Sequence, residues 1–304
     1  MEPIRDVRVS PEMGLKGLVE LYSGMYGFMA GHVAEAVEVL RRGIRESRLR
    51  VLTFTGNLVA TGLRGVLAQL IEEGLFNVVI TTTGALDHDI ARANGGTYYK
   101  GAFEYDDAEL LGKGFHRLGN ILIPLESYGP RVEEFTRRLL ERIDGRVGLY
   151  EVLDVAGSMI TDRNSILRAA HRAGARVFVP GWPDGAFGTS LFMEAQRLGR
   201  DIVVDYFKDM KLLSEIFFTS QDSKATGLII GGGISKHHAI WWSQFREGLD
   251  YVVYITTAVE YDGSLSGAHP REAISWGKVK PSAEKVVVYG DATIILPIIA
   301  SQIL

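Results

Sequence analysis

A lysine near the C-terminus is the residue of this chain best suited to covalent chemistry. The segment Glu272–Lys278 reads EAISWGK, a helical turn with Trp276 near its end, a glycine that stops the helix, and then Lys278. An indole and an apolar turn beside an ammonium would exclude water, lower the lysine pKa and free the amine as a nucleophile for imine chemistry. The alternative is a solvated lysine that merely follows a helix end. Because the chain has no cysteine, a thiolate nucleophile, a disulfide and a Cys-ligated zinc are excluded.

Other motifs offer weaker chemistry. GGGISK (Gly231–Lys236) has the first two glycines of the dinucleotide fingerprint but a lysine at the third, so it predicts either a phosphate-binding turn or an ordinary strand–helix turn. GSLSG (Gly263–Gly267) resembles a nucleophile elbow, yet Leu265 stands where the serine should be. His237 and His238 have no acidic or thiol ligands close in sequence, so we predict no metal site.

The composition narrows the class of protein. Of 304 residues, 46% are hydrophobic and 23% charged, which is ordinary for a globular chain. The formal net charge of −4 argues against an overall basic surface for nucleic acid. No run of 18 apolar residues could span a membrane, and the N-terminus lacks the apolar core of a secretory signal. We therefore expect a cytoplasmic enzyme or binding protein with neither nucleic acid nor membrane as a partner.

The candidate residues must be positioned by alternating strands and helices. Short β-branched runs, typical of strands buried on both faces of a parallel sheet, predict strands at residues 50–55, 77–82, 119–124, 176–180, 202–205, 227–230, 251–256 and 286–289. Helical patterns lie at residues 31–42, 59–73, 130–143, 165–173 and 238–247. The alternation predicts an α/β fold of right-handed βαβ units, with a doubly wound, mostly parallel, Rossmann-like sheet in a single large domain.

Glycine-rich and polar turns follow several of the predicted strands. In doubly wound sheets, ligands bind beyond the carboxyl ends of the strands, so these turns are the places to search. They span residues 55–57, 82–89, 181–188, 231–238 and 256–267. Five such turns at one sheet edge favour a large ligand, with a nucleotide the usual case.

Several blocks of this sequence together resemble the deoxyhypusine synthase family. EAISWGK, followed by VVVYGDAT (residues 286–293), is similar to the C-terminal signature of that family. Further blocks occur in order and at family spacing from about residue 27: GFMAG (27–31), TGNLVATG (55–62), TTTGALDHD (81–89), HRLGNILIP (116–124), PDGAFG (183–188), GGGISKHH (231–238) and YITTAVEYDGS (254–264). The resemblance implies a homotetramer with active sites shared across a dimer interface, each chain a single domain (1–304) with residues 1–26 as an N-terminal extension. It also implies NAD as a cofactor, bound without the usual fingerprint.

The family reaction implies roles for two residues. NAD accepts a hydride from the carbon beside the secondary amine of spermidine, and the lysine matched by Lys278 captures the aminobutyl group as an imine while 1,3-diaminopropane leaves. The group then passes to a lysine of the translation factor 5A precursor, which forms deoxyhypusine, and NADH returns the hydride. His237 matches a histidine near the substrate nitrogen, where a pKa near 6.5 suits proton transfer. The alternative for His237 is a turn histidine with only structural hydrogen bonds.

The resemblance also implies binding residues. Cofactor contacts are expected at Gly56, Asn57, Leu58, Val59, Ala60, Thr82, Thr83, Gly84, Asp184, Gly232, Thr257, Ala258, Asp291 and Ala292. The two aspartates could accept hydrogen bonds from ribose hydroxyls. Substrate contacts are expected at Asp87, His88, Gly263, Ser264, Glu272 and Trp276.

Three positions depart from the carboxylates with which the family holds the tricationic spermidine. His88 stands in place of a glutamate, and Thr189 and Leu265 each stand in place of an aspartate. A hydrogen bond that involves a charged group contributes about 1.5–3 kcal/mol. Even with incomplete additivity, three losses would weaken amine binding more than tenfold.

Three hypotheses about function follow. In the first, the chain is a deoxyhypusine synthase in which Asp87, Asp89 and Glu272 bind the amine. In the second, it is an NAD-dependent paralogue, similar to homospermidine synthase, that acts on a different amine. In the third, it is a catalytically silent NAD-binding scaffold, against which Lys278 argues.

Overall fold

The computed structural model describes residues 2–304, which form two compact units that alternate along the chain. Unit 1 contains the residues up to Phe54, Leu75–Ile80 and Leu212–Leu304, and unit 2 contains Thr55–Gly74 and Thr81–Lys211. The α/β class is confirmed, and the expectation of a single domain stays a prediction.

A parallel sheet forms the centre of unit 1. Its strands lie in the order β11–β10–β9–β1–β2, and each neighbouring pair among them is parallel. The valine, isoleucine and leucine runs of the inner strands are buried on both faces, as a sheet covered on two sides requires. The bounds are β1 (Ser47–Thr53), β2 (Val78–Ile80), β9 (Lys224–Ile230), β10 (Leu249–Thr256) and β11 (Val279–Tyr289).

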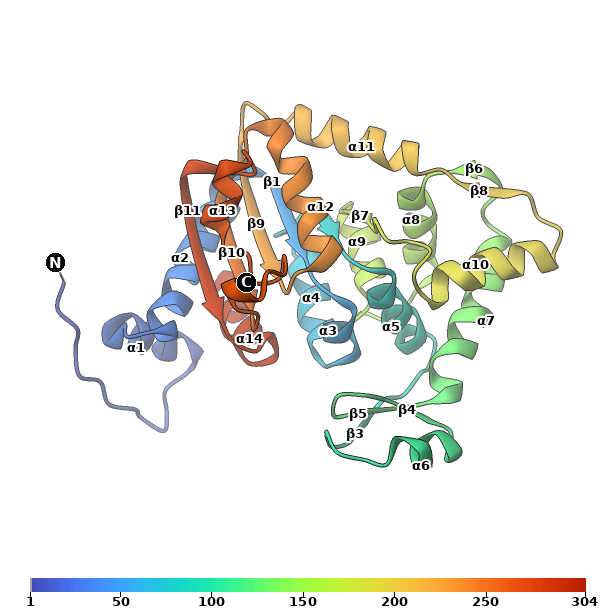
Figure 1. Cartoon of the computed structure of the whole chain (residues 1–304), viewed down its shortest axis with the longest axis horizontal. Coiled ribbons are helices and arrows are strands. Elements are labelled where there is room, and N and C mark those ends of the chain that lie inside the picture. The colour runs from blue at the N-terminus through green and yellow to red at the C-terminus, as the bar shows by residue number, and fades with distance from the viewer. Residues whose placement is uncertain (1) are drawn as a thin grey trace. The chain divides into compact units, whose positions relative to one another are not determined.

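Helices cover both faces of this sheet, which confirms the doubly wound arrangement for unit 1. Helix α2 (Met29–Glu46) packs against β9, β10 and β11, and α12 (Gly233–Ser243) packs against β1 and β2. Figure 1 shows α12 in front of the sheet and α2 behind it. Gly43 permits the close approach of α2, because a Cβ there would lie 2.5 Å from Thr226 Oγ1. The other elements of this unit are α1 (Leu15–Met25), η2 (Gln244–Arg246), η3 (Glu260–Asp262), α13 (Pro270–Ser275) and α14 (Ala292–Ile303).

Unit 2 is mainly helical. Helix α9 packs against α4 and α8, and α7 packs against α5 and α10. Its helices are α3 (Gly56–Ala60), α4 (Leu63–Glu72), α5 (Thr83–Ala93), α6 (Asp107–Gly112), η1 (Leu125–Ser127), α7 (Gly129–Leu140), α8 (Leu149–Met159), α9 (Ile166–Ala173) and α10 (Ala186–Arg197), while α11 (Tyr206–Phe218) includes residues of both units.

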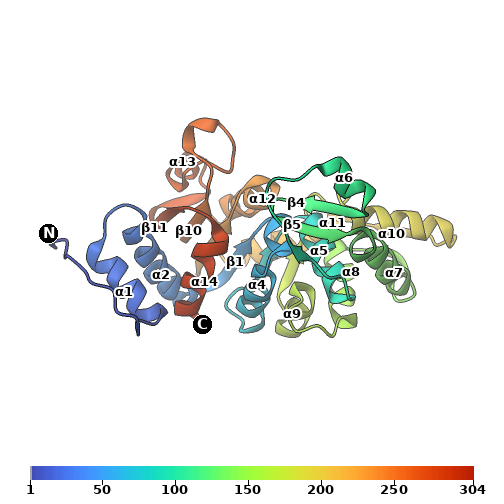
Figure 2. The same cartoon turned by 90° about the horizontal axis from the view of Figure 1, so that it is seen from below.

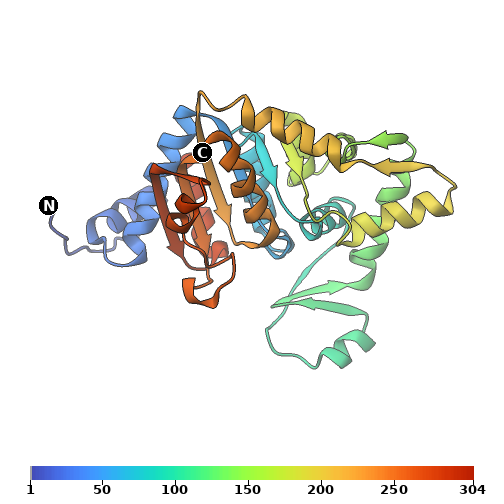
Figure 3. The same ribbon diagram turned by 45° about the horizontal axis from the view of Figure 1, so that its top comes forward.

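The strands of unit 2 are short. An antiparallel sheet, β3–β5–β4, forms an arm that extends from the ends of α5 and α7 and is green in Figure 3. Strands β6 and β8 form a separate parallel pair. The bounds are β3 (Tyr99–Lys100), β4 (Phe115–Leu118), β5 (Ile121–Pro124), β6 (Gly145–Val147), β7 (Arg176–Phe178) and β8 (Ile202–Val204).

Some sequence predictions are corrected. The runs at 119–124 and 202–205 form strands β5 and β8 outside the central parallel sheet, and they are only partly buried. The helix predicted at 59–73 is two helices, because Thr61 is extended and its hydroxyl donates to the Leu58 carbonyl while accepting from the Leu63 N–H. No helix formed by residues 2–304 has both the length and the apolar character needed to cross a membrane.

Candidate active site

A helix-terminating turn positions Lys278 in unit 1. The Gly277 N–H donates to the Ile274 carbonyl and the Lys278 N–H donates to the Ala273 carbonyl, both at 2.9 Å, which is the hydrogen-bond pattern of a Schellman motif. Gly277 has a φ of +66°, a left-handed conformation that strains residues with a Cβ. The Trp-Gly-Lys order therefore ends α13 abruptly and starts β11 at the lysine.

The Lys278 amine lies between two indole rings. Its side chain belongs to a residue only 8% exposed, and Nζ lies 5.1 Å from the ring centroid of Trp276 and 5.8 Å from that of Trp241. Within residues 2–304 this amine forms no ion pair. The expectation of an indole beside the lysine is confirmed, and the solvated alternative is wrong.

His237 lies in the same cluster. It stands four residues before Trp241 on α12, so the two side chains share one helix face, and their rings stack with centroids 5.9 Å apart. Burial, followed by the nearby charge of Lys278, lowers the pKa of His237 below its ordinary value. The sequence analysis missed Trp241, although the spacing of four from His237 was a usable signal.

The predicted substrate residues of unit 1 occupy one loop–helix segment beside the lysine. Gly263 and Ser264 are exposed in the loop after η3, and Glu272 and Trp276 are exposed on and after α13. Figure 2 shows this loop and α13 projecting from the sheet beside β10 and β11. Leu265, at a position where the family has aspartate, is half-buried in the same loop.

The predicted cofactor residues of unit 1 lie beyond the carboxyl ends of three adjacent strands. Gly232 caps α12 after β9, Thr257 and Ala258 follow β10, and Asp291 caps α14 after β11. A Cβ on Gly232 would lie 2.1 Å from Ser266 Oγ, so only glycine fits there. Because the strands are parallel and adjacent, these turns share one edge of the sheet, as expected.

The predicted cofactor residues of unit 2 gather at helix N-termini. Residues 56–60 form all of α3, and Thr82 caps α5. A Cβ on Gly56 would lie 2.8 Å from the carbonyl carbon of Gly84, so the two turns touch through backbone. The Thr83 hydroxyl lies 3.0 Å from the Trp182 carbonyl, which ties α5 to the turn that carries Asp184. Free N–H groups in such first turns suit a phosphate-bearing cofactor.

Asp87 and His88 have different environments on α5. Asp87 is 1% exposed, and its carboxylate accepts the N–H groups of Ala186 (2.9 Å) and Phe187 (2.7 Å) at the start of α10 as well as the Tyr128 hydroxyl (3.1 Å). Burial raises the pKa of Asp87. His88 Nδ1 lies 2.8 Å from the Tyr98 hydroxyl, and burial lowers the pKa of His88 to about 4, so it is neutral at pH 7.

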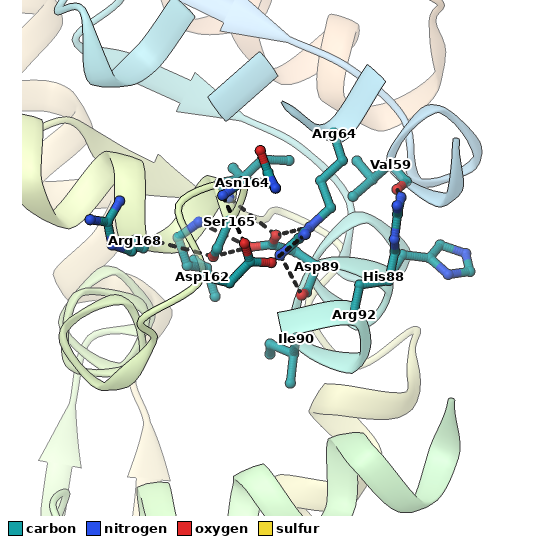
Figure 4. A network of polar contacts seen from close by, with 12 residues as sticks. Val59, Arg64, His88, Asp89, Ile90, Arg92, Asp162, Asn164, Ser165 and Arg168 are labelled. Atoms are coloured by element: carbon teal, nitrogen blue, oxygen red, sulfur yellow. Dashed lines mark hydrogen bonds and ion pairs between the residues drawn. The ribbon is translucent and has the colours of Figure 1, made fainter. Parts of the chain in front are cut away.

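Asp89 is fully engaged in a structural network (Figure 4). It is 0% exposed, and it accepts hydrogen bonds from Arg64 Nε at 2.7 Å, Ser165 Oγ at 2.8 Å and the N–H groups of Ile166 and Leu167 at 3.1 and 3.0 Å. Four donors fill the lone pairs of one carboxylate. The expectation that Asp89 binds the amine is therefore wrong: this residue joins α5 to α4 and α9.

Thr189, another departure from the family, is exposed on α10 and lines an apolar cavity of about 370 Å³. Trp182, Leu191 and Phe192 are among the other lining residues. Throughout residues 2–304, no group of three or more His, Asp or Glu side chains could hold a metal ion.

A neutral histidine beside the cluster predicts a pH dependence of stability. His238 Nε2 accepts the Trp242 indole N–H at 3.2 Å, and burial lowers the pKa of His238 to about 4. Between that value and the unfolded pKa near 6.5, the folded state binds fewer protons, so the free energy of unfolding falls as the pH falls through this window. His238→Gln should flatten this part of the curve of unfolding free energy against pH, measured by urea titration. His171→Gln, at a surface ion pair with Asp154, is the matched control, and an unchanged slope in His238→Gln would contradict the prediction.

Comparison with known proteins identifies the family. The sequence model described as deoxyhypusine synthase matches residues 17–303. A relative from Aeropyrum pernix, named "Probable deoxyhypusine synthase", is 68% identical over 304 residues, which cover 99% of this chain and 97% of the relative. A relative of the same name from Ignicoccus hospitalis is 53% identical over 307 residues, covering 100% and 96%. The crystal structure of a deoxyhypusine synthase candidate from Entamoeba histolytica shares the fold, with a TM-score of 0.66, 20% identity, and coverage of 98% of this chain and 96% of that one.

Proposed function

The chain belongs to the deoxyhypusine synthase family and is a transferase, and we propose that it moves the aminobutyl group of spermidine to a lysine of the translation factor 5A precursor in the cytoplasm, with NAD as cofactor. The observation that carries this proposal is the Lys278 amine, which is buried between two indoles with no ion pair and lies near His237. An amine that is neither hydrated nor paired with a carboxylate gives up its proton more readily than a surface lysine does.

The proposed chemistry balances without a further reactant. When bound, NAD takes a hydride from the carbon beside the secondary amine of spermidine and later returns it. The Lys278 amine adds to the resulting carbon–nitrogen double bond, its new C–N bond replaces the bond to 1,3-diaminopropane, and that product leaves as a free amine. The acceptor lysine then displaces Lys278 in the same way, and the enzyme regains its free amine.

His237 suits the proton steps of this sequence. The substrate nitrogen must lose a proton before hydride transfer, and the leaving amine must gain one. Because the pKa of His237 is lowered, it is mostly neutral at pH 7 and can accept a proton, while its stacking on Trp241 fixes the ring. We assign it as the general acid–base group.

The cofactor is proposed to contact the turns already described, residue by residue within each unit. In unit 2, the first turns of α3 and α5 offer backbone N–H groups to phosphate, and Asp184 offers a carboxylate to a ribose. In unit 1, Gly232, Thr257, Ala258 and Ala292 lie in the turns, and Asp291 provides the second carboxylate.

For the amine, Glu272 is the exposed carboxylate of the proposed substrate set, with Trp276, Gly263 and Ser264 beside it. Asp87 donates its lone pairs to α10 and Tyr128, and neutral His88 cannot pair with an ammonium as a carboxylate does. The loss of carboxylates raised the possibility of a paralogue for another amine, but the family evidence does not favour it. We also propose the homotetramer of the family, which light scattering of the purified protein would test.

One incubation tests the function. The protein is mixed with NAD, the factor 5A precursor and spermidine labelled in its aminobutyl half, and the intact masses of both proteins are measured. We expect the labelled group on the precursor, with no transfer when NAD is omitted. NADH formation with another amine and no modified precursor would instead indicate the paralogue, and NAD binding without reduction by any amine would indicate a scaffold.

A further inference from the structure

A second lysine of unit 1, outside the roles assigned above, is buried more completely than Lys278. Lys236 on α12 is 1% exposed, and its Nζ donates to the Ala268 carbonyl at 2.8 Å and lies 4.2 Å from the ring centroid of Tyr254 on β10. No carboxylate among residues 2–304 pairs with it. Burying an ammonium is costly unless it is paired, and one carbonyl and one ring are a sparse set of partners for three N–H groups.

The partner of Lys236 lies at a structurally important place in the chain. Ala268 ends the loop that carries Gly263 and Ser264, and the next residue, His269, caps α13 by accepting the Arg271 N–H at 3.1 Å. Whatever fixes the Ala268 carbonyl therefore fixes the start of α13.

The same loop is held against the sheet at a second point. The Thr256 hydroxyl donates to the Ser266 carbonyl at 3.1 Å, and Gly232 packs directly against Ser266. These contacts hold the middle of the loop, two residues before Ala268. The bond from Lys236 is the one that reaches the residue immediately before the α13 cap.

Helix α13 carries the residues on which the proposed chemistry depends. It has six residues, with Glu272 in its first turn, and its terminating turn places Trp276 and Lys278. A helix this short has little stability of its own, so its position depends on tertiary contacts at its ends. Trp241 and His237, which Lys278 faces, lie on the same helix as Lys236.

We propose that Lys236 is a positioning residue: by tying α12 to the Ala268 carbonyl, it holds α13 where Lys278 and Trp276 meet Trp241 and His237. This inference rests on the proposed function for its kinetic consequence. The lysine in GGGISK that breaks the dinucleotide fingerprint then has a purpose, because a glycine there could make no such tie.

The charge of Lys236 strengthens the tie. A neutral amine can still donate to a carbonyl, but it loses the attraction to the Tyr254 ring. Burial lowers the pKa of Lys236 to about 8, opposed by the charge of Glu272. The titratable groups that face it are Tyr254 from β10 and Glu272 and His269 from the α13 segment.

Two substitutions at this position test the proposal. Lys236→Met keeps the length of the side chain but removes both the charge and the donors, whereas Lys236→Arg keeps both. Because misplacing a reacting group by about 1 Å can cost on the order of 10²-fold in rate, we expect Lys236→Met to slow imine formation on Lys278 by about 10- to 100-fold, with Lys236→Arg recovering part of it. The measurement is the rate of borohydride-trapped adduct on Lys278, with KM for spermidine determined separately.

The pH profile separates positioning from simple core stability. In the wild type, imine formation should fall above pH 8 as Lys236 becomes neutral, although higher pH would by itself favour the Lys278 nucleophile. In Lys236→Arg the guanidinium stays charged, so this fall should move to higher pH. Lys285→Met is the matched control, because Lys285 also donates to one backbone carbonyl, that of Ala283 at 3.0 Å, away from the loop.

Hydrogen exchange keeps this test independent of the proposed function. Lys236→Met should speed amide exchange in residues 263–278 and leave α2 unchanged, whether or not spermidine is the substrate. Wild-type exchange in that segment together with a wild-type rate and pH profile would overturn the proposal. A wild type that forms no adduct with any amine, combined with faster exchange in the variant, would refute the proposed function and leave the positioning role intact.

Discussion

The Lys278→Arg variant should lose aminobutyl transfer by about 10⁴-fold or more, the order of loss seen when a covalent nucleophile is removed from an enzyme. A guanidinium is never deprotonated in proteins, so it cannot form the carbon–nitrogen double bond that the proposed mechanism requires. It keeps the positive charge and can still contact the faces of Trp276 and Trp241, so the surrounding cluster should hold its shape. Transfer is measured by the mass of the acceptor protein, and adduct formation by borohydride trapping.

A neighbouring lysine supplies the control for this experiment. Lys280 lies two residues further along β11, and its Nζ forms an ion pair with Asp250 at 2.9 Å, a contact that arginine can also make. Lys280→Arg should therefore keep near wild-type transfer. NAD affinity should be nearly unchanged in both variants. If Lys278→Arg still transferred the group at a comparable rate, Lys278 would have no covalent role and the mechanism would need another nucleophile.

The Asp89→Asn variant should lower the free energy of unfolding by about 3–5 kcal/mol, the usual cost of breaking a buried ion pair from one side. Asp89 is 0% exposed and Arg64 is 3% exposed, so removal of the carboxylate charge leaves a buried guanidinium with Asp162 as its remaining acidic partner, at 2.7 Å. The α9 N–H groups that Asp89 accepts would also lose a charged acceptor. Urea unfolding at pH 7 gives the measurement.

Two further variants interpret the result. Glu72→Gln disrupts a surface pair with Arg168, at 3.3 Å, and should cost less than about 1 kcal/mol. Adding Arg64→Met to Asp89→Asn should recover part of the loss, because no unpaired charge then remains in the interior. Equal costs for Asp89→Asn and Glu72→Gln would show that the network of Figure 4 does not hold α5 in place.

This network also bears on the site, because α5 is the helix whose first turn is proposed to bind the cofactor. Thr82 caps that helix, and Asp89 lies in its second half, bonded to α4 and α9. A helix fixed at Asp89 and at Asp87, which binds the start of α10, keeps its N-terminal N–H groups in a constant direction. Preorganised donors of this kind bind phosphate without an additional ordering cost.

The sequence by itself determined those features that depend on neighbouring residues. Continuous runs of β-branched residues define buried parallel strands, as in β9 and β10, because no other short element hides apolar side chains on both faces. The Trp-Gly-Lys order predicts a helix that stops at a left-handed glycine, and the structure shows that turn at Gly277. The family, too, could be recognised from short blocks at fixed spacing.

Tertiary structure alone decided which polar residues are available for chemistry. Asp87, His88 and Asp89 are consecutive, but successive residues of a helix point about 100° apart, so they face three different environments. Asp89 meets Arg64, 25 positions away, and Lys236 meets Ala268, 32 positions away. Whether a carboxylate or an amine is free depends on partners that only folding brings within 3 Å, and sequence spacing carries no information about such distances.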